Sequence, residues 1–197
     1  MISNPHRKEG TKIKKAYTIG IAGGSAGGKS TFAQRLQAAL SDLEVLLLPM
    51  DAYFKPEGDR PTATGRTGRS YRDDNNPESF DLPRLRRDVS DAAENGSCRV
   101  LIVEGLLTLW DCGLYEQLDL RLFVDCRADE RIVRRLKRNM QWGYTFDEIA
   151  DVYLDLVRTR HDMYVEPSRW KADLVINGSG CTDNALAVLA SYIRTQL

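Results

Sequence analysis

The segment from Gly23 to Ser30, Gly-Gly-Ser-Ala-Gly-Gly-Lys-Ser, matches the pattern G-x-x-x-x-G-K-S/T at every fixed position. A β-rich apolar run over residues 17–22 precedes it, and a helical pattern over residues 30–40 follows it. The glycines let successive backbone N–H groups turn into one hollow, where the start of the helix adds a partial positive charge. Such a hollow suits a di- or triphosphate, with Lys29 reaching the β- and γ-phosphates and the Ser30 hydroxyl binding Mg²⁺.

The pattern therefore predicts a nucleotide site, and the alternative is a glycine-rich turn that binds nothing. The residues predicted to hold the nucleotide are Gly24, Ser25, Ala26, Gly27, Gly28, Lys29, Ser30 and Thr31.

Two carboxylates stand at the ends of predicted strands. Asp51 follows the run Leu-Leu-Pro-Met, and a carboxylate beside a phosphate loop can accept the proton of a substrate hydroxyl during phosphoryl transfer. Glu104 ends the fully apolar run Leu-Ile-Val and would be costly to bury without a partner. Facing the nucleotide, it could hold Mg²⁺ through water. The competing interpretations are a turn or helix cap for Asp51 and a structural salt bridge for Glu104.

Basic residues are concentrated between residues 131 and 160, with few acids among them. A charged helix face is usually only a solvated face, but a positioned arginine can also stabilise the oxygens of a transferring phosphoryl group. His161 has no nucleophile beside it and is expected at the surface or against a substrate. Trp142 is expected to pack rather than to stack on a base. The basic residues of this stretch are Arg131, Arg134, Arg135, Lys137, Arg138, Arg158 and Arg160.

The chain has 197 residues, enough for one well-buried α/β domain and too few for two of ordinary size. Lysine plus arginine and aspartate plus glutamate both number 28, which argues against a protein that coats nucleic acid or an anionic membrane. Residues 1–16 are expected to form a flexible basic tail, and residues 17–197 a single domain. The four cysteines form no C-x-x-C pair and no apolar run reaches membrane-spanning length, so a cytoplasmic protein with reduced thiols is expected.

Short β-branched or leucine-rich runs alternate with longer amphipathic ones, which is typical of a mainly parallel sheet flanked by helices. Thr145 stands three residues before Glu148, as in a capping box at the start of a helix. The α/β fold is expected to contain five strands, over residues 18–22, 44–49, 99–104, 120–125 and 174–176. Its helices are expected over residues 30–40, 83–95, 128–140, 145–163 and 183–196.

Residues 54–76 interrupt this alternation of strand-like and helix-like runs. They contain three glycines and two prolines, and their apolar residues show no clear period. A stretch of this length without regular structure is uncommon in a compact domain and is often functional. It follows the end of the second strand, where ligands bind in open α/β sheets. The segment is therefore interpreted as a substrate-side flap, with a mobile surface loop as the alternative. Its basic residues are Lys55, Arg60, Arg66, Arg69 and Arg72.

From about residue 17 to residue 180 the chain resembles the uridine kinase and phosphoribulokinase family, because five motifs occur in the family's order. Besides the phosphate loop, these are Met-Asp-Ala-Tyr-Phe at 50–54, Asn-Pro-Glu-Ser-Phe-Asp at 76–81, Val-Glu-Gly at 103–105 and Tyr-Val-Glu-Pro-Ser at 164–168. The resemblance implies a P-loop kinase fold with a small helical lid over about residues 134–146. It also implies ATP with Mg²⁺ as the donor and a small molecule bearing a hydroxyl group as the acceptor.

The same resemblance implies roles for individual residues. Asp51 is similar to the family's general base, and residues 178–184 correspond to the loop near the adenine. The phosphate and metal contacts would come from Lys29, Ser30 and Glu104, and the lid arginines would be Arg135 and Arg138.

The residues expected to bind the acceptor depart from the family pattern. Uridine kinases usually have Asn-Phe-Asp-His-Pro where residues 73–77 are Asp-Asp-Asn-Asn-Pro, so Asn75 replaces the carboxylate that holds the ribose hydroxyls. The lid lacks two of the usual arginines, since Gln-Trp-Gly-Tyr at 141–144 replaces Glu-Arg-Gly-Arg. The hairpin that contacts uracil before the third strand is missing. The acceptor is expected to meet Asp51, Tyr53, Asn75, Phe80 and His161.

Several acceptors and two classes of function remain open. Relatives that phosphorylate nicotinamide riboside share the Phe-Lys-Pro at 54–56, whereas the arginines of residues 54–76 would suit a phosphorylated sugar, as in phosphoribulokinase. The leading hypothesis is an ATP-dependent kinase for a nucleoside-like or sugar-like alcohol, and the alternative is a nucleotide-dependent regulator without catalysis. A GTPase is disfavoured because no Asn-Lys-x-Asp is present. Family members often self-associate, so a homo-oligomer is left open, and the small-molecule acceptor is the expected partner.

Overall fold

A parallel sheet forms the centre of the computed structural model, which describes residues 15–197. Apart from its last two residues, the tail expected over residues 1–16 lies outside the described residues. The strand order is β2-β5-β1-β6-β7, and every neighbouring pair is parallel. These strands are β1 (Tyr17–Gly23), β2 (Val45–Pro49), β5 (Val100–Glu104), β6 (Leu120–Asp125) and β7 (Leu174–Asn177).

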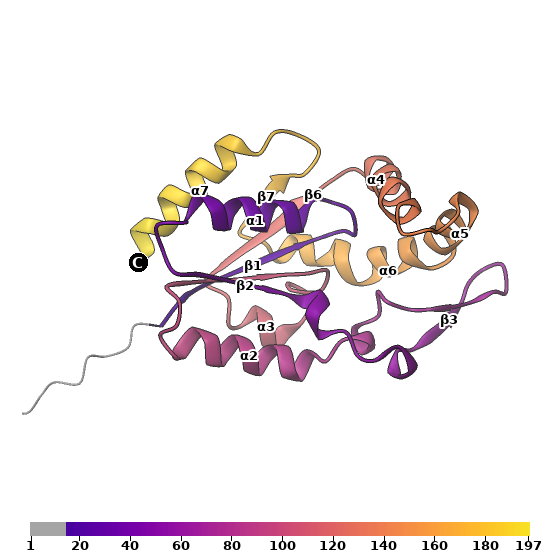
Figure 1. Ribbon diagram of the computed structural model, residues 1–197, viewed down its shortest axis with the longest axis horizontal. Helices are drawn as coiled ribbons and strands as arrows, with labels where there is room; N and C mark the ends of the chain where they lie inside the picture. Colours follow the sequence, from indigo (N-terminus) through magenta and orange to yellow (C-terminus); the bar gives the residue numbers. More distant parts are fainter. Residues whose placement is uncertain (1–14) are drawn as a thin grey trace, which may run out of the picture.

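Helices cover both faces of this sheet, with α1 and α7 on one side and α2 and α3 on the other (Figure 1). Alternate residues of the strands enter separate apolar clusters: Ile19 and Ile102 pack towards α1 and α7, whereas Leu101 and Val103 pack towards α2. Within residues 15–197, no helix is long and apolar enough to span a bilayer. The helices are α1 (Lys29–Ala39), α2 (Leu82–Glu94), α3 (Cys112–Tyr115), α4 (Ala128–Met140), α5 (Phe146–Val152), α6 (Arg158–Arg160) and α7 (Asp183–Gln196).

The five predicted strands are confirmed, each with ends within one residue of those expected. The capping box is also confirmed, because Thr145 and Glu148 bond each other's backbone N–H groups at the start of α5. The helix expected over residues 145–163 is less regular than predicted. Its backbone stays helical, but the wider π-helical turns Tyr153–Val157 and His161–Val165 flank the single turn of α6. Only residues 95–99 join α2 to β5, too few for a further hairpin before that strand.

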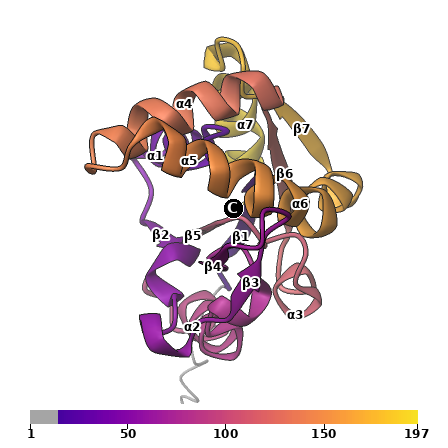
Figure 2. The same ribbon diagram turned by 90° about the vertical axis from the view of Figure 1, so that its right-hand side faces the viewer.

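The segment 54–76 is more ordered than its sequence suggested. It contains a short antiparallel hairpin, β3 (Thr62–Thr64) and β4 (Ser70–Arg72), in which Ala63 lies opposite Tyr71. Three-residue strands are too short to produce a detectable alternation of apolar residues, so the sequence pattern missed them. Figure 2 shows this hairpin at the same end of the molecule as α4, α5 and α6.

Candidate active site

The phosphate loop joins β1 to α1 in the conformation that its sequence requires. Gly28, at the helix N-cap, has a φ of +96°, and Ala26 has a φ of +61°. The N–H of Gly27 donates to the carbonyl of Gly24 at 2.9 Å, which closes the turn. In the part of the chain that the structure describes, no side chain caps the start of α1, so its first N–H groups are available to an anion. The loop thus has the geometry of a phosphate cradle.

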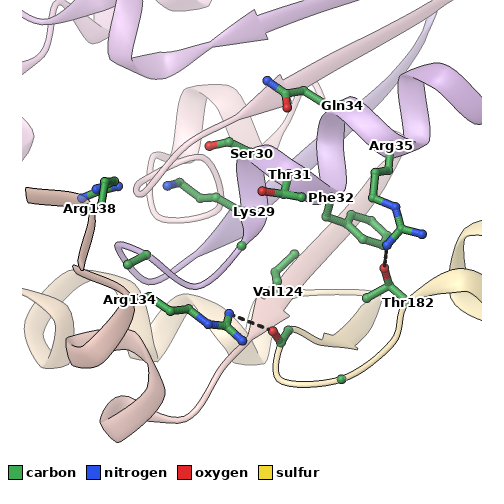
Figure 3. Close-up of a pocket in the computed structure, with 14 residues that line it drawn as sticks. Lys29, Ser30, Thr31, Phe32, Gln34, Arg35, Val124, Arg134, Arg138 and Thr182 are labelled. Carbon is green, nitrogen blue, oxygen red and sulfur yellow. Dashed lines mark hydrogen bonds between the residues drawn. The ribbon is translucent and has the colours of Figure 1, made fainter. Parts of the chain in front are cut away.

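A cavity of about 640 Å³ opens beside this loop (Figure 3), and we call it the donor cavity. On one side, Arg35 of α1 donates to the Thr182 hydroxyl at 2.7 Å, and Arg134 of α4 donates to the carbonyl of Gly178 at 3.0 Å. The loop 178–184 therefore lies at the edge of the donor cavity, between α1 and α4. Of the predicted nucleotide contacts, five line this cavity: Ala26, Gly28, Lys29, Ser30 and Thr31.

The remaining predicted contacts lie around the loop. Ser25 faces a second cavity, while Gly24 and Gly27 lie against the side chain of Arg131 from α4. Among the lining residues that were not predicted are Gln34 and Arg35 of α1. Their spacing of three and four residues from Thr31 places them on the same face of α1, which is the signal that could have found them.

The metal-binding residues expected from the sequence lie together. The Ser30 hydroxyl donates to both carboxylate oxygens of Glu104, at 3.0 and 3.1 Å. Glu104 is only 5% exposed, and this burial raises the pKa of its carboxyl, although the Lys29 ammonium and the Ser30 hydrogen bond oppose the shift. A cation would relieve this buried charge. Mg²⁺ takes few ligands from a protein and keeps waters and phosphate oxygens as the others, so one hydroxyl and one carboxylate can hold it. Ser30 and Glu104 therefore fit Mg²⁺.

Replacing Glu104 with glutamine is expected to stabilise the ligand-free protein at pH 7 and to weaken its binding of ATP in the presence of Mg²⁺. Glutamine removes a buried charge while keeping the shape of the side chain. Thermal unfolding with and without Mg²⁺ and ATP measures both effects, since a ligand that binds the folded state more tightly raises the melting temperature further. The control is Glu94→Gln, at an exposed position at the end of α2. Unchanged dependence of ATP binding on Mg²⁺ in Glu104→Gln would contradict this metal site.

The second cavity, of about 600 Å³, lies on the other side of the phosphate loop, and we call it the acceptor cavity. Asp51, in the short 3₁₀ turn Met50–Tyr53 that follows β2, faces it. Phe80 also lines the cavity and stacks on Phe54, with 4.2 Å between ring centroids. Asn75 lies on the same wall, so three of the five predicted acceptor contacts come together here.

The other two predicted acceptor contacts, Tyr53 and His161, do not line this cavity. Tyr53 is 6% exposed, and its hydroxyl donates to Asp88 of α2 at 2.9 Å. Burial and the Asp88 carboxylate together raise the pKa of Tyr53 to about 12. Both ring nitrogens of His161 lie within 3.2 Å of the Arg131 guanidinium, behind the phosphate loop. The structure thus assigns a packing environment to Tyr53 and a buried polar one to His161.

The pKa of His161 is lowered by burial and by Arg131, which together outweigh the opposite effect of Glu166. Because the folded protein holds this imidazole neutral, the unfolded chain binds more protons below the ordinary pKa of 6.5, and stability falls as the pH drops through that value. His161→Gln is expected to flatten the dependence of melting temperature on pH between about 7 and 5. The chain has only two histidines, so the comparison with the wild type isolates this one. Equal slopes of melting temperature against pH in the wild type and in His161→Gln would contradict a neutral imidazole at His161 in the folded protein.

Two cations stand where the cavities meet. Among the described residues, only Lys29 and Arg138 line both the donor and the acceptor cavity. Arg135, one turn before Arg138 on α4, donates to the Ser25 hydroxyl at 3.0 Å, and its pKa is lowered by burial and by the Arg138 charge. Of the seven basic residues between 131 and 160, these two arginines were implied by the family resemblance, and both lie beside the phosphate loop.

The turn between α4 and α5 adds aromatic side chains to the acceptor cavity. Trp142 and Tyr144 line it and remain 64% and 52% exposed. The guanidinium of Arg138 lies 5.0 Å from the centre of the Trp142 ring, within the range of a cation–π contact. The expectation that Trp142 is a packing residue is therefore wrong. Its place in a tight turn, rather than within an apolar stripe, is the signal that was overlooked.

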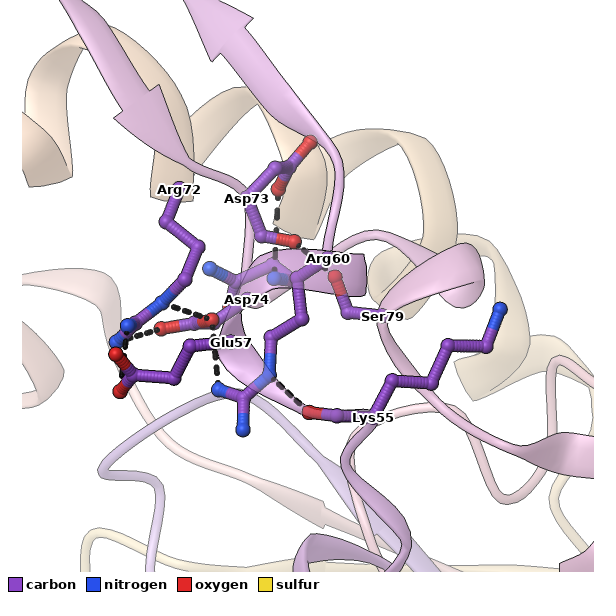
Figure 4. Close-up of polar contacts among 8 residues, drawn as sticks. Lys55, Glu57, Arg60, Arg72, Asp73, Asp74 and Ser79 are labelled. Carbon is purple, nitrogen blue, oxygen red and sulfur yellow. Dashed lines mark hydrogen bonds and ion pairs between the residues drawn. The ribbon is translucent and has the colours of Figure 1, made fainter.

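The arginines of the segment 54–76 are largely neutralised by carboxylates (Figure 4). Arg60 lies 3.1 Å from Asp74 and also donates to a backbone carbonyl. Arg72 contacts Asp74 at 2.9 Å and Glu57 at 2.7 Å. Arg69, in the turn directly before β4, pairs with a carboxylate of α5 at 2.5 Å. Arg69 and Arg72 line the acceptor cavity, but each is paired with a carboxylate, so neither contributes a free charge to it.

Comparison with known proteins agrees with this geometry. The model of the phosphoribulokinase/uridine kinase family matches residues 85–185. A uridine kinase of Deinococcus deserti is 32% identical and aligns with 93% of this chain and 98% of its own length. A uridine kinase of Geobacillus kaustophilus is also 32% identical, over 93% of this chain and 96% of its own.

Solved structures agree in fold. A protein of Silicibacter sp. TM1040, provisionally described as a fructose transport system kinase, has a TM-score of 0.67 at 21% identity and covers 87% of this chain and 92% of its own. The predicted P-loop kinase fold is thus confirmed. The chain belongs to the phosphoribulokinase/uridine kinase family of kinases.

Proposed function

We propose that the protein transfers the γ-phosphoryl group of ATP to a hydroxyl group of a nucleoside-like or sugar-like molecule that carries no phosphate group. The observation that carries this proposal is the meeting of two cavities at Lys29 and Arg138, with Asp51 on the acceptor side of that junction. A phosphoryl group passing from donor to acceptor must cross this junction. A nucleotide-binding regulator would have no use for a second cavity that opens onto the phosphates and carries a carboxylate.

Different residues of the site have different roles in the reaction. Asp51 accepts the proton of the acceptor hydroxyl, and Lys29 with Arg138 stabilises the charge on the transferring group. Arg135 supports the phosphate loop through Ser25. Mg²⁺ at Ser30 and Glu104 would neutralise charge on the phosphates.

Residues 134–146 serve as a lid within a single domain of residues 17–197. Closing such a lid excludes water and so limits the hydrolysis of ATP without an acceptor.

An acceptor without a phosphate group is favoured over a phosphorylated sugar because the flap offers few free cations. Arg60, Arg69 and Arg72 are paired with carboxylates, and Lys55 and Arg66 do not line the acceptor cavity. A phosphorylated sugar there would have to compete with these carboxylates for the guanidinium groups. The stacked ring of Phe80 and the exposed rings of Trp142 and Tyr144 instead suit the flat face of a base or the apolar face of a sugar.

The test is ADP release from Mg²⁺ and ATP in the presence of single acceptors: nucleosides, nicotinamide riboside, free sugars and pentose phosphates. We expect turnover with at least one compound that carries no phosphate group and none with the pentose phosphates. Preference for a pentose phosphate would overturn the choice of acceptor. Tight ATP binding without turnover for any compound would favour the regulatory alternative.

A further inference from the structure

Asp155 lies behind the acceptor cavity, in the π-helical turn that follows α5, and does not line the cavity itself. It is 8% exposed. One of its carboxylate oxygens, Oδ2, accepts hydrogen bonds from the hydroxyl of Thr67 and from the hydroxyl of Tyr71 at 3.1 Å. Both donors belong to the β3–β4 hairpin, more than 80 residues away in the chain. These bonds lower the pKa of Asp155, so the carboxylate is ionised at neutral pH.

The backbone of the hairpin is shaped to approach this carboxylate. A Cβ atom added at Gly65 would lie 2.5 to 2.7 Å from side-chain atoms of Asp155, closer than such contacts allow. A salt bridge between Arg69 and Asp151, one helical turn earlier, lies beside the same contact. Gly65 thus permits a close approach that any larger residue would prevent.

The two elements that Asp155 joins both line the acceptor cavity. Arg69 and Tyr71 of the hairpin line it, and so do Ile149 and Val152 of α5. Figure 2 shows the hairpin and the helical segment meeting at this end of the molecule. The position of the hairpin therefore decides the width of the cavity and the direction of the Tyr71 ring.

We propose that Asp155 is a positioning residue, which fixes the β3–β4 hairpin against the helical segment 146–165 and so sets the shape of the acceptor cavity. This inference rests on the proposed function, since it assigns the hairpin to acceptor binding. Asp155 acts through Thr67 and Tyr71 and does not touch the reacting groups. Its loss should therefore change the binding of the acceptor far more than that of ATP.

The first test compares Asp155→Ala with Asp155→Asn. Both hydroxyl donors use the same oxygen, so asparagine can keep both hydrogen bonds, whereas alanine removes them. We expect alanine to raise the KM for the acceptor roughly tenfold, with the KM for ATP unchanged, and asparagine to restore most of the loss. Equal KM values for the acceptor in wild type and Asp155→Ala would overturn the positioning role.

A second pair of variants does not depend on Asp155 itself. Gly65→Ala is expected to push the hairpin away from the helix and to reproduce the effect of Asp155→Ala. The control is Gly58→Ala in the same segment, where an added Cβ meets nothing within 4 Å. A Gly65→Ala enzyme with wild-type KM values would contradict the close approach.

Amide hydrogen exchange of residues 62–72 in the ligand-free proteins separates this inference from the proposed function. Exchange should be faster in Asp155→Ala and Gly65→Ala than in wild type and Gly58→Ala. The reason is that contacts with the helical segment 146–165, more than the pairing of two three-residue strands, hold the hairpin in place. Unchanged exchange would show that Asp155 does not hold the hairpin. If the wild type turns over no acceptor, the proposed function fails and the positioning role with it, while exchange still decides whether the contact holds the hairpin.

Discussion

Replacing Asp51 with asparagine is expected to lower kcat roughly 100- to 10,000-fold while leaving the affinity for ATP unchanged. Asparagine occupies nearly the same volume but cannot accept a proton from the acceptor hydroxyl. Asp51 lines the acceptor cavity and not the donor cavity, so the binding of ATP should be preserved. Steady-state ADP release gives kcat, and isothermal titration with Mg²⁺ and ATP gives the dissociation constant.

The matched control is Asp59→Asn. Asp59 is exposed in the flap that follows Asp51 in the chain, and it lines neither cavity. This substitution changes the net charge by the same amount and should retain wild-type turnover. If Asp51→Asn kept nearly the full kcat, Asp51 would not be the general base. Loss of ATP binding in that variant would instead mean that Asp51 contributes to the donor site.

The donor side of this site was largely predictable because its residues are contiguous in the chain. The phosphate loop and the first turn of α1 supply the contacts within residues 24–31, and their spacing alone carries the geometry. Glu104 was also recognisable, since a charge at the end of a fully buried strand is costly unless a cation or a hydrogen-bond donor meets it. The strands themselves followed from short runs of apolar residues bounded by turns.

The acceptor side could not be predicted to the same extent, since it is assembled from separate segments. Asp51 and Tyr53 are neighbours in one motif, yet a 3₁₀ turn directs them apart, Asp51 to the cavity and Tyr53 to Asp88. His161 lies at a π-helical turn, where an extra residue in the turn rotates the following side chains relative to a regular α-helix. A uniform helical pattern over residues 145–163 therefore could not place it.

The paired arginines of the flap show a further limit of sequence analysis. A basic segment near a phosphate site suggested a charged acceptor, but the sequence does not reveal which acids fold back onto those cations. Asp74 neutralises Arg60 and Arg72 from within the segment, while the partner of Arg69 comes from α5. The acceptor class thus depends on contacts that form only in the folded protein.

Replacing Arg138 with methionine is expected to lower kcat on the order of 1000-fold, because Arg138 is one of two cations at the junction of the cavities. Methionine keeps the apolar stem and removes the guanidinium that would stabilise the charge of the transferring phosphoryl group. Arg138→Lys should recover only part of the loss, since an ammonium cannot bind two phosphoryl oxygens with a planar fork. Rapid-quench measurement of a single turnover isolates the chemical step from product release.

Lys137→Met is the control for this effect, because Lys137 is exposed on the same helix and lines neither cavity. It removes one positive charge from α4 without touching the junction and should keep the wild-type rate. Arg135→Met provides the decisive comparison, since Arg135 contacts Ser25 and lines the acceptor cavity alone. If Arg135→Met lost more activity than Arg138→Met, the stabilising cation would be Arg135, and the meeting of the two cavities would no longer identify where the phosphoryl group crosses.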